Sequence, residues 1–517
     1  MTRFKAKSPS KKQKPIVWTI SGADCSGGAG IAADIKTGHN LNVEVCHLIT
    51  ANTVQNSTKL FSINSTPTKI LTEQVHALRF DKPPTVIKIG LLVNNEQVIW
   101  LTALLSELKK QLTNLVTVYD PVGQASVGGK LSTLLLPDLK PLLPLIDVIT
   151  PNLNEAEQLR ELQDIKTDQS AADNILALGC NAVIIKGGHN LASSNCIDVC
   201  WQKSAIGTVQ KYQLQSAKIA TNDSHGGGCS FATALASFLA HGYLLRDAFT
   251  LTKAFINQGL SANVNNTVSN STDTSAGYYG AFEQGCWPNE PSHFPLVVSS
   301  HSHNLLSSSN FPTLGLTAKE RLGLYPVIDS LEWLERLLPL NFKIIQLRIK
   351  NMSDTELEPI IEKAVALARD YNCRLFINDH WQLAIKYHAY GVHIGQEDLA
   401  NADLQAIAKA GLRLGISTHG CYEFLLAKQL QPSYLAIGAI FPTKTKDMTG
   451  QIQGIENLQH ILALSSDIPV VAIGGINEAR LPQVWQTGVS SIAVVTAITE
   501  AEQPITAVKA LQKLVSS

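Results

Sequence analysis

Three consecutive glycines and a cysteine, Gly226, Gly227, Gly228 and Cys229, directly precede a segment with helical periodicity. Its apolar residues recur at intervals of three and four positions, and Gly242 follows where a helix would end. These apolar residues are Ala232, Leu235, Ala236 and Leu239. Unpaired N–H groups at a helix N-terminus attract anions, and glycine lets a phosphate approach the backbone closely. The pattern predicts an anion site, with a tight turn in which glycine only relieves strain as the alternative.

A second group of chemically active residues follows short apolar segments in the C-terminal part of the chain. Eight such segments are separated by helical stretches: LYPVI, KIIQLR, RLFIN, GVHI, LGIST, YLAIGAI, VVAIGG and SIAVV. Eight βα units predict a (β/α)8 barrel, or TIM barrel, whose active site lies at the carboxyl ends of the strands. Polar residues lie at the ends of the second to fifth segments or directly after them: Gln346, Arg348, Lys350, Asn378, Asp379, Gln396, Asp398 and Ser417.

The charges on this rim favour phosphorylated ligands and a hard metal ion. Asp379 and Asp398 follow neighbouring strands, and Mg²⁺ typically takes few protein carboxylates together with phosphate oxygens. Arg348, Lys350 and Lys446 add positive charge. Positions after the last two strands predict a second phosphate site: Gly474, Gly475, Val495 and Thr496. Solvated ion pairs around a structural rim are the alternative.

The N-terminal half has its own set of candidate residues. Asn152 and Glu155 form an N-x-x-E pair of the kind that can order magnesium and its waters near a phosphate. Lys186 follows a β-like segment and can reach nucleotide phosphates as a point charge. Asp34 and Gln55 offer hydrogen bonds to a polar heterocycle. Structural alternatives exist, because Glu155 would also suit the first turn of a helix and Asp34 a helix cap.

Two domains must position these residues. From residue 15 to about 260, short β-rich segments alternate with helical stretches, which predicts a mainly parallel sheet with helices on both faces. The expected strands are at residues 16–21, 43–50, 85–90, 115–120, 147–152 and 182–187. Residues 1–14 read as a basic tail, and residues 264–315 are rich in Ser, Asn, Thr, Gly and Pro, as in a linker. The predicted domains are therefore residues 15–263 and 316–517.

The composition is that of a globular enzyme without a dominant charge. The 517 residues include 42 basic and 42 acidic side chains, so no overall field favours nucleic acid or membrane. Nine cysteines without metal-type spacing favour a reducing compartment, and the cytoplasm is the expected location. No secretory signal and no apolar run of the roughly 18 residues needed for a membrane span is recognisable. Small molecules are the expected partners, and a homo-oligomer is compatible with the sequence.

The motifs of both halves resemble known families. The N-terminal segments TISGADCSGGAGIAADIKT, TANTVQN, KIGLL, ITPNLNEAE, KGGH and HGGGC resemble the hydroxymethylpyrimidine/phosphomethylpyrimidine kinases of thiamine synthesis, which have a ribokinase-like doubly wound fold. The C-terminal segments QLRIK, FINDHWQLAIKYHAYGVHIGQEDL, GISTH, FPTKTK, VAIGGI and SIAVVTAI resemble thiamine-phosphate synthases. Together the two resemblances cover nearly the whole chain outside the tail and the linker.

The kinase resemblance implies roles for individual residues. The pyrimidine would be surrounded by Gly22, Ala29, Asp34, Gln55 and Val122. Lys186 would attend ATP, the co-substrate, with Asn152 and Glu155, and residues 226–229 would form the anion hole with Cys229 near the accepting hydroxymethyl group. Phosphoryl transfer mainly needs such positioning and charge stabilisation. The family usually has threonine in place of Gly227 and proline in place of Cys25.

The synthase resemblance implies a second set. Asp379 and Asp398 would bind Mg²⁺. The pyrimidine diphosphate would be held by Gln346, Leu347, Arg348, Ile349, Lys350, Asn378, Ser417 and Lys446. The thiazole phosphate would be held by Thr443, Lys444, Thr445, Gly475, Val495 and Thr496, the last usually serine in the family. Diphosphate departure followed by attack of the thiazole nitrogen requires charge neutralisation and no protein base.

The resemblances together imply a bifunctional transferase. The N-terminal domain would phosphorylate 4-amino-5-hydroxymethyl-2-methylpyrimidine twice, and the barrel would couple the diphosphate with 4-methyl-5-(2-phosphoethyl)thiazole. Two alternatives for the N-terminal half stay open, a pyridoxal-type or other ribokinase-like kinase and a pyrimidine-binding sensor derived from a kinase. The Gly227 difference raises the second alternative, and intact Lys186, Asn152, Glu155 and Cys229 oppose it.

Overall fold

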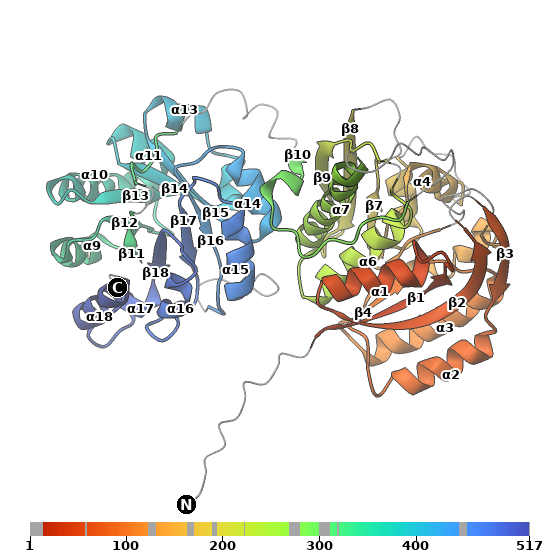
Figure 1. Ribbon diagram of the computed structural model, residues 1–517. Coiled ribbons are helices and arrows are strands. Elements are labelled where there is room, and N and C mark those ends of the chain that lie inside the picture. Colours follow the sequence, from red (N-terminus) through yellow and green to blue (C-terminus); the bar gives the residue numbers. More distant parts are fainter. Residues whose placement is uncertain are drawn as a thin grey trace, which may run out of the picture. The chain divides into compact units, whose positions relative to one another are not determined.

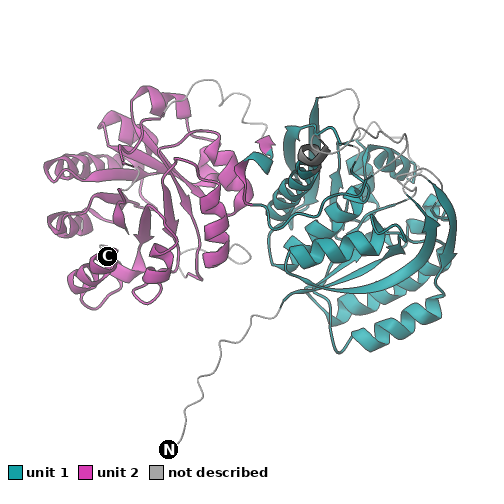
Figure 2. Ribbon diagram, in the orientation of Figure 1, with its two compact units in different colours: residues 1–288, 292–295 teal, residues 289–291, 296–517 magenta. Residues whose placement is uncertain are grey.

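A computed structural model describes the chain in ten stretches and divides it into two compact units. The described residues are 14–56, 59–122, 131–162, 170–188, 194–221, 223–267, 280–298, 311–317, 320–443 and 452–515. Unit 1 comprises residues 1–288 and 292–295, and unit 2 comprises residues 289–291 and 296–517. Figure 2 shows the two units in different colours.

Unit 1 is built on a mixed sheet. The strand order is β9-β8-β7-β6-β5-β4-β1-β2-β3, and the strands from β7 to β2 in this order run parallel. Strands β3, β8 and β9, toward the two ends of the sheet, pair antiparallel with their neighbours. The strands are β1 (Ile16–Ala23), β2 (Glu44–Gln55), β3 (Leu60–Ser65), β4 (Val86–Ile89), β5 (Val116–Tyr119), β6 (Val148–Ile149), β7 (Ala182–Ile185), β8 (Asn195–Lys203) and β9 (Val209–Ala217).

Helices cover both faces of this sheet (Figure 1). One face packs against α2 (Thr68–Leu78), α3 (Asn95–Gln111), α4 (Leu153–Arg160) and α5 (Ala171–Ala177) in a single apolar core. The other face carries α1 (Gly30–Asn40), α6 (Gly227–Ala240) and α7 (Leu245–Thr267). Strand β1 contributes side chains to both faces of the sheet. Ile16, Trp18 and Ile20 lie in the apolar core with α2 to α5, whereas Thr19, on the opposite face, contacts Asp34 of α1.

The sequence predicts this arrangement well in its parallel part. The expected strands at residues 16–21, 43–50, 85–90, 115–120, 147–152 and 182–187 coincide with β1, β2, β4, β5, β6 and β7. The prediction of a helix after the glycines is also confirmed, since α6 spans Gly227–Ala240 and Gly242 has a φ of 89° just beyond it. The antiparallel strands β3, β8 and β9 were not predicted, because their polar side chains mask the alternating pattern.

Unit 2 contains a closed barrel of eight parallel strands in sequential order, as the sequence predicts. The strands are β11 (Gly323–Ile328), β12 (Ile344–Leu347), β13 (Arg374–Asn378), β14 (Gly391–Ile394), β15 (Arg413–Thr418), β16 (Tyr434–Ile437), β17 (Val470–Ile473) and β18 (Ser491–Val494). The helices are α9 (Leu331–Leu337), α10 (Asp354–Asp370), α11 (Trp381–Lys386), α12 (Gln396–Leu399), α13 (Leu404–Lys409), α14 (Cys421–Lys428), α15 (Gly454–Ala463), α16 (Leu481–Trp485), α17 (Thr496–Thr499) and α18 (Pro504–Val515).

Side chains fill the barrel interior. Tyr325, Phe376 and Tyr434 are almost fully buried and lie in one apolar cluster with smaller residues from β12, β17 and β18. The Phe376 and Tyr434 rings meet edge to face at 5.1 Å. The interior is therefore a packed core that supports the carboxyl ends of the strands from below.

The segment expected to be a linker contains packed structure. Helix α7 runs through the predicted boundary at residue 263 to Thr267. Farther on, Trp287 packs edge to face against Phe238 of α6 at 5.0 Å, and Phe282 is buried. In unit 2, β10 (Leu296–Val298) accepts a hydrogen bond at the Val297 carbonyl from Gln429, the residue that follows α14. The parts of residues 264–315 that the structure describes thus belong to one unit or the other.

No helix within the described ranges combines the length and the apolar character needed to cross a bilayer.

Candidate active sites

The first site is a cavity of about 740 Å³ at the carboxyl ends of the parallel strands in unit 1. The N-terminus of α6 and the loops after β1, β5, β6 and β7 surround it, which is where ligands bind in such sheets. Among the predicted residues, those lining it are Gly22, Ala29, Gln55, Val122, Asn152, Glu155, Lys186, Gly226, Gly227, Gly228 and Cys229.

The three positions at the start of α6 are occupied by glycine for different physical reasons. Gly226 has a φ of 83°, and a Cβ atom there would lie 1.9 Å from the Gly28 carbonyl oxygen, so only glycine fits. A Cβ atom on Gly228 would lie 3.7 Å from an Asp120 oxygen and 3.8 Å from the Lys186 nitrogen. A Cβ atom on Gly227 would meet nothing within 4 Å. A tight turn, the alternative to an anion site, explains why residue 226 is glycine. Gly227 and Gly228 are not required by the turn and leave backbone exposed to the cavity.

Charged side chains face these glycines across the cavity. Lys186 Nζ donates a hydrogen bond to Asp120 Oδ1 at 2.9 Å. Burial lowers the pKa of Lys186, but Asp120 and Glu155 outweigh burial and raise it. Burial raises the pKa of Glu155 to about 7, against the opposing effect of Lys186. Lys186 is therefore a permanent cation, whereas Glu155 changes its charge near neutral pH.

The N-x-x-E pair has the structural role that the sequence offered as the alternative, at the start of a helix. Asn152 Oδ1 accepts the Glu155 backbone N–H at 2.9 Å, and Glu155 Oε2 accepts the Asn152 backbone N–H at 2.8 Å. This reciprocal capping box fixes the start of α4. Both residues also line the cavity, so the cap holds the Glu155 carboxylate near Lys186.

Cys229 is half-buried in the first turn of α6 and lines the cavity. Burial raises the pKa of its thiol to about 11, although Lys88 opposes this rise and the Gly30 backbone N–H donates to the sulfur. The thiol is therefore neutral near pH 7.

Asp34 differs from its predicted role, since it does not line the cavity. It lies within α1, fully buried, and its carboxylate accepts hydrogen bonds from Lys88 at 2.8 and 2.9 Å and from Thr233 at 2.7 Å. Thr19 also donates to it. These partners belong to β4, α6 and β1, so Asp34 ties α6 to the sheet, and its place inside α1 means that it does not cap that helix.

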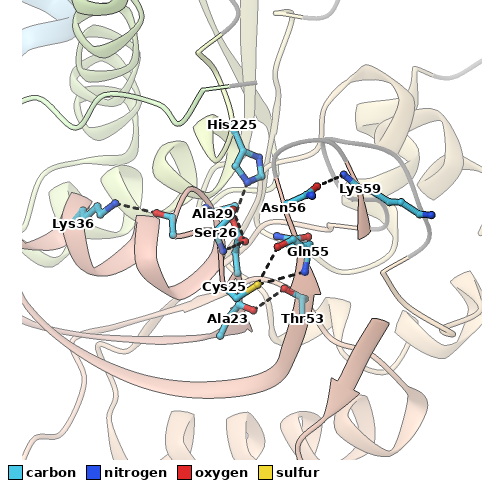
Figure 3. A network of polar contacts seen from close by, with 12 residues as sticks. Ala23, Cys25, Ser26, Ala29, Lys36, Thr53, Gln55, Asn56, Lys59 and His225 are labelled. Atoms are coloured by element: carbon cyan, nitrogen blue, oxygen red, sulfur yellow. Dashed lines mark hydrogen bonds and ion pairs between the residues drawn. The ribbon is translucent and has the colours of Figure 1, made fainter. Parts of the chain in front are cut away.

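Asp24 and His225 form a second pair that the sequence analysis missed. His225 Nε2 lies 2.8 Å from Asp24 Oδ2, and both side chains are buried where the β1 loop meets the start of α6. Burial raises the pKa of Asp24, but hydrogen bonds from His225, Gln55 and Ser26 outweigh it and hold the pKa well below its usual range. Figure 3 shows His225 directed at the loop that carries Ser26 and Ala29.

Gln55 is held at the edge of this network. Cys25 Sγ donates to the Gln55 carbonyl at 3.1 Å and accepts its backbone N–H at 3.4 Å, as drawn in Figure 3. Asp120 is another cavity residue that the sequence analysis missed. Its position directly after a buried strand was the signal that could have found it.

The second site is a pocket of about 290 Å³ at the carboxyl ends of the barrel strands. The predicted residues that line it are Gln346, Arg348, Lys350, Asn378, Asp379, Gln396, Asp398, Ser417, Thr443, Gly474, Gly475, Val495 and Thr496. Leu347 and Ile349 do not line it, because side chains alternate along β12 and its continuation. The predictions for Lys444, Thr445 and Lys446 fall outside the described residues.

Asp379 and Asp398 suit a hard divalent cation. Burial and the neighbouring charge of Asp398 raise the pKa of Asp379, and the Gly395 backbone N–H opposes this rise. A cation between the two carboxylates would relieve their repulsion. No cluster of three or more His, Cys, Asp or Glu side chains that could hold a metal occurs among the described residues. Two carboxylates with open coordination positions are what Mg²⁺ uses beside a phosphorylated substrate.

The opposite side of the pocket consists of backbone. Gly474 and Gly475 have φ values of 99° and 64°, and a Cβ atom on Gly475 would lie 2.5 Å from the Pro442 carbonyl oxygen. Only glycine fits this turn, which leaves the backbone open beside Val495 and Thr496. His393 also lines the pocket, although its strand GVHI gave no signal beyond a buried core residue.

The geometry defines two α/β domains, each with a pocket at the carboxyl ends of parallel strands, one with a mixed sheet and a glycine loop and one with a TIM barrel. A family model described as phosphomethylpyrimidine kinase matches residues 24–272, and one described as thiamine monophosphate synthase matches residues 324–498. A thiamine-phosphate synthase of Yersinia pseudotuberculosis serotype O:1b (strain IP 31758) is 54% identical over 194 residues, which are 38% of this chain and 88% of that protein.

Two solved structures resemble unit 1. A pyridoxal kinase from Staphylococcus aureus, in complex with AMP-PCP and pyridoxal, is 27% identical with a TM-score of 0.44, over 55% of this chain and 99% of that one. A phosphomethylpyrimidine kinase from Clostridium difficile 630 is 30% identical with a TM-score of 0.37, over 47% and 99%. The chain belongs to the thiamine-phosphate synthase family and carries a phosphomethylpyrimidine kinase domain in addition. It is a bifunctional transferase of thiamine biosynthesis.

Proposed function

We propose that unit 1 transfers the γ-phosphoryl group of ATP first to the hydroxymethyl group of 4-amino-5-hydroxymethyl-2-methylpyrimidine and then to the resulting monophosphate. The observation that carries this proposal is the open backbone of Gly227 and Gly228 opposite Lys186 in one cavity. Backbone N–H groups at the start of α6 would stabilise the charge that develops on the transferred phosphoryl oxygens. Lys186 would hold the nucleotide phosphates, and Gln55 and Val122 would contact the pyrimidine.

The barrel couples the pyrimidine diphosphate with the thiazole phosphate in this proposal. Asp379 and Asp398 hold Mg²⁺, which would supply the charge that neutralises the departing diphosphate. Arg348 and Lys350 add positive charge on the same side of the pocket, and Asn378 and Ser417 hold the pyrimidine. The backbone at Gly475, Val495 and Thr496 holds the thiazole phosphate.

The proposal includes a reducing, cytoplasmic location. All nine cysteines are free thiols, which supports a reducing compartment.

The direct test uses the full chain with ATP, Mg²⁺, the hydroxymethylpyrimidine and the thiazole phosphate. The expected products are ADP, pyrophosphate and thiamine phosphate, measured by chromatography. Parallel reactions supply the pyrimidine diphosphate directly, and others replace the pyrimidine with pyridoxal. Phosphorylation of pyridoxal alone would favour the pyridoxal-type alternative. Binding of the pyrimidine without ATP turnover would favour the sensor.

Replacing Gly227 with threonine is expected to raise the kinase kcat/KM modestly. Position 227 has room for a side chain, and the family usually has threonine there. One additional hydrogen bond would be worth about 1 kcal/mol, or roughly a 5-fold gain. Steady-state ATP turnover measures this effect. The matched control is Gly226→Thr, which should be inactive because its φ is 83° and the Gly28 oxygen occupies the space. A large loss in Gly227→Thr would show that the loop cannot accept the hydroxyl.

Kinase activity is expected to rise with pH through about 7, because Glu155 must be ionised to help hold a magnesium ion. Burial raises the Glu155 pKa to about 7, so the acid form prevails below that pH and the carboxylate above it. Glu155→Gln should lower kcat/KM and remove this ascending limb of the pH profile. Glu157→Gln is the control, since Glu157 is exposed on the same helix and pairs with Arg160. An unchanged limb in Glu155→Gln would assign it to another group.

A further inference from the structure

Four side chains form a continuous row of hydrogen bonds beneath the barrel pocket. The Tyr325 and Tyr434 hydroxyl oxygens are 2.8 Å apart, and the Tyr434 oxygen is 2.7 Å from His393 Nδ1. His393 Nε2 is 2.8 Å from Ser417 Oγ. The row starts on β11, crosses the barrel core through β16 and β14, and ends on β15, strands labelled in Figure 1. Only its last two members, His393 and Ser417, line the pocket.

The row is buried and made of neutral groups. Tyr325 and Tyr434 are 2% and 0% exposed, and His393 is 7% exposed. Burial, reinforced by the nearby Arg348 cation, lowers the pKa of His393 to about 3. Burial also raises the pKa of both tyrosines well above the usual range. The imidazole therefore carries a single N–H group, on one nitrogen or the other.

Because the Tyr325 hydroxyl group is buried, it determines which group donates and which accepts in each hydrogen bond of the row. Among the described residues, the Tyr325 hydroxyl has one hydrogen-bond partner, Tyr434. A buried O–H group without an acceptor is unfavourable, so Tyr325 donates to Tyr434. Tyr434 must then donate its own proton to His393 Nδ1. The imidazole proton consequently lies on Nε2 and is donated to Ser417 Oγ.

The opposite direction leaves a donor unsatisfied. If Ser417 donated to His393 Nε2, the Nδ1–H group would donate to Tyr434 and Tyr434 to Tyr325. The Tyr325 proton would then point into the apolar core around Phe376 and Val327 without an acceptor. Only the first direction pairs every buried proton, and it leaves the Ser417 proton free to enter the pocket.

We propose that Tyr325, Tyr434 and His393 are positioning residues that fix Ser417 as a hydrogen-bond donor to a ring nitrogen of the pyrimidine diphosphate. The inference rests on the proposed function of the barrel. The exocyclic amino group of the pyrimidine is a poor hydrogen-bond acceptor, and the phosphate oxygens would pair with Arg348 and Lys350. A ring nitrogen is therefore the acceptor proposed for Ser417. The pocket lining includes small apolar side chains, Ala436 on the strand next to Ser417 and Val327 and Ala493 on other strands, which suit the heterocycle. The row thus selects a ligand with an unprotonated ring nitrogen at this position.

The histidine tautomer tests the row without any substrate. Two-bond ¹H–¹⁵N correlation spectra of the full chain, labelled at histidine, distinguish the Nε2–H from the Nδ1–H form. His393→Gln assigns the His393 signals by their loss. The expected result is a neutral ring protonated at Nε2. A ring protonated at Nδ1, at both nitrogens, or exchanging between the two neutral forms would overturn the proposal.

Variants test the effect on substrate binding. His393→Leu removes the donor to Ser417 and is expected to raise KM for the pyrimidine diphosphate about 10-fold, with a smaller fall in kcat. His393→Gln keeps an amide N–H for Ser417 and should restore most of the affinity. Tyr390→Phe serves as a control for barrel packing, because the Tyr390 hydroxyl meets Arg374 outside the pocket. Equal KM changes in the Leu and Gln variants, with both proteins folded, would contradict the donor role.

Analogues separate this proposal from the proposed function. Two substrates are compared with the natural diphosphate, each with one ring nitrogen replaced by C–H. The wild type should discriminate against one of them by about 10-fold or more, and Ser417→Ala should lose that discrimination. Equal coupling of both analogues by the wild type, or discrimination that Ser417→Ala retains, while thiamine phosphate is still formed, would overturn the ring-nitrogen contact and leave the synthase function standing. Absence of any synthase activity in the wild type would overturn the function itself.

Discussion

Replacing Asp379 with asparagine should reduce thiamine-phosphate synthesis by about 10²-fold or more and leave phosphorylation of hydroxymethylpyrimidine unchanged. Metal-based charge stabilisation of a leaving group is worth several kcal/mol, which corresponds to a rate loss of this size. Asp379 faces Asp398 in the barrel pocket, and the kinase cavity contains neither residue. Both activities are measured on the same preparation, with the synthase assayed from the pyrimidine diphosphate over a Mg²⁺ titration.

The loss should come from metal binding and not from unfolding. Burial and Asp398 raise the Asp379 pKa, so the folded state disfavours the ionised form and its stability falls as pH rises through that pKa. An uncharged amide is therefore expected to keep or raise the metal-free melting temperature at pH 7. Mg²⁺ with pyrophosphate should raise the melting temperature of the wild type and of the exposed control Asp370→Asn, but not of Asp379→Asn. A wild-type rate in Asp379→Asn at low Mg²⁺ would refute the two-carboxylate site.

The barrel was predictable because its information is local. Each strand is a short apolar segment, and the polar residue that follows a strand must lie on the same rim as the others. Asp379, Asp398 and Ser417 therefore come together without knowledge of any packing detail. The family resemblance assigned every residue from 346 to 350 to the site, and this was too broad. Side chains alternate along the chain, so those of Leu347 and Ile349 do not line the pocket.

The kinase half required information that sequence spacing does not carry. Asp34 and Asp120 are both acidic residues near strands, yet Asp34 is enclosed with Lys88 whereas Asp120 meets Lys186 in the cavity. The difference arises from which face of α1 packs on the sheet, a tertiary property. Charge complementarity also appears only in the fold, because Lys88 and Asp34 are 54 residues apart.

Replacing Cys229 with alanine should lower kinase turnover by about 10²-fold, the effect typical of losing a group that contacts the reacting atoms. Affinity for the pyrimidine should fall less than turnover, because the backbone N–H groups of α6 remain. Steady-state ATP turnover with hydroxymethylpyrimidine measures both effects. Cys286→Ala is the control, since Cys286 is an exposed thiol that does not line the cavity.

The thiol should act in its neutral form. Burial raises the Cys229 pKa to about 11, so the thiolate is scarce below pH 9 and cannot serve as the base for the accepting hydroxyl group. We expect turnover to show no ascending limb between pH 8 and 9 in the wild type, and Cys229→Ser to retain more activity than Cys229→Ala because its hydroxyl can still donate a hydrogen bond to the substrate. An ascending limb near pH 8.5 that disappears in both variants would instead identify a reactive thiolate. Unchanged turnover in Cys229→Ala would show that the side chain only fills space at the start of α6.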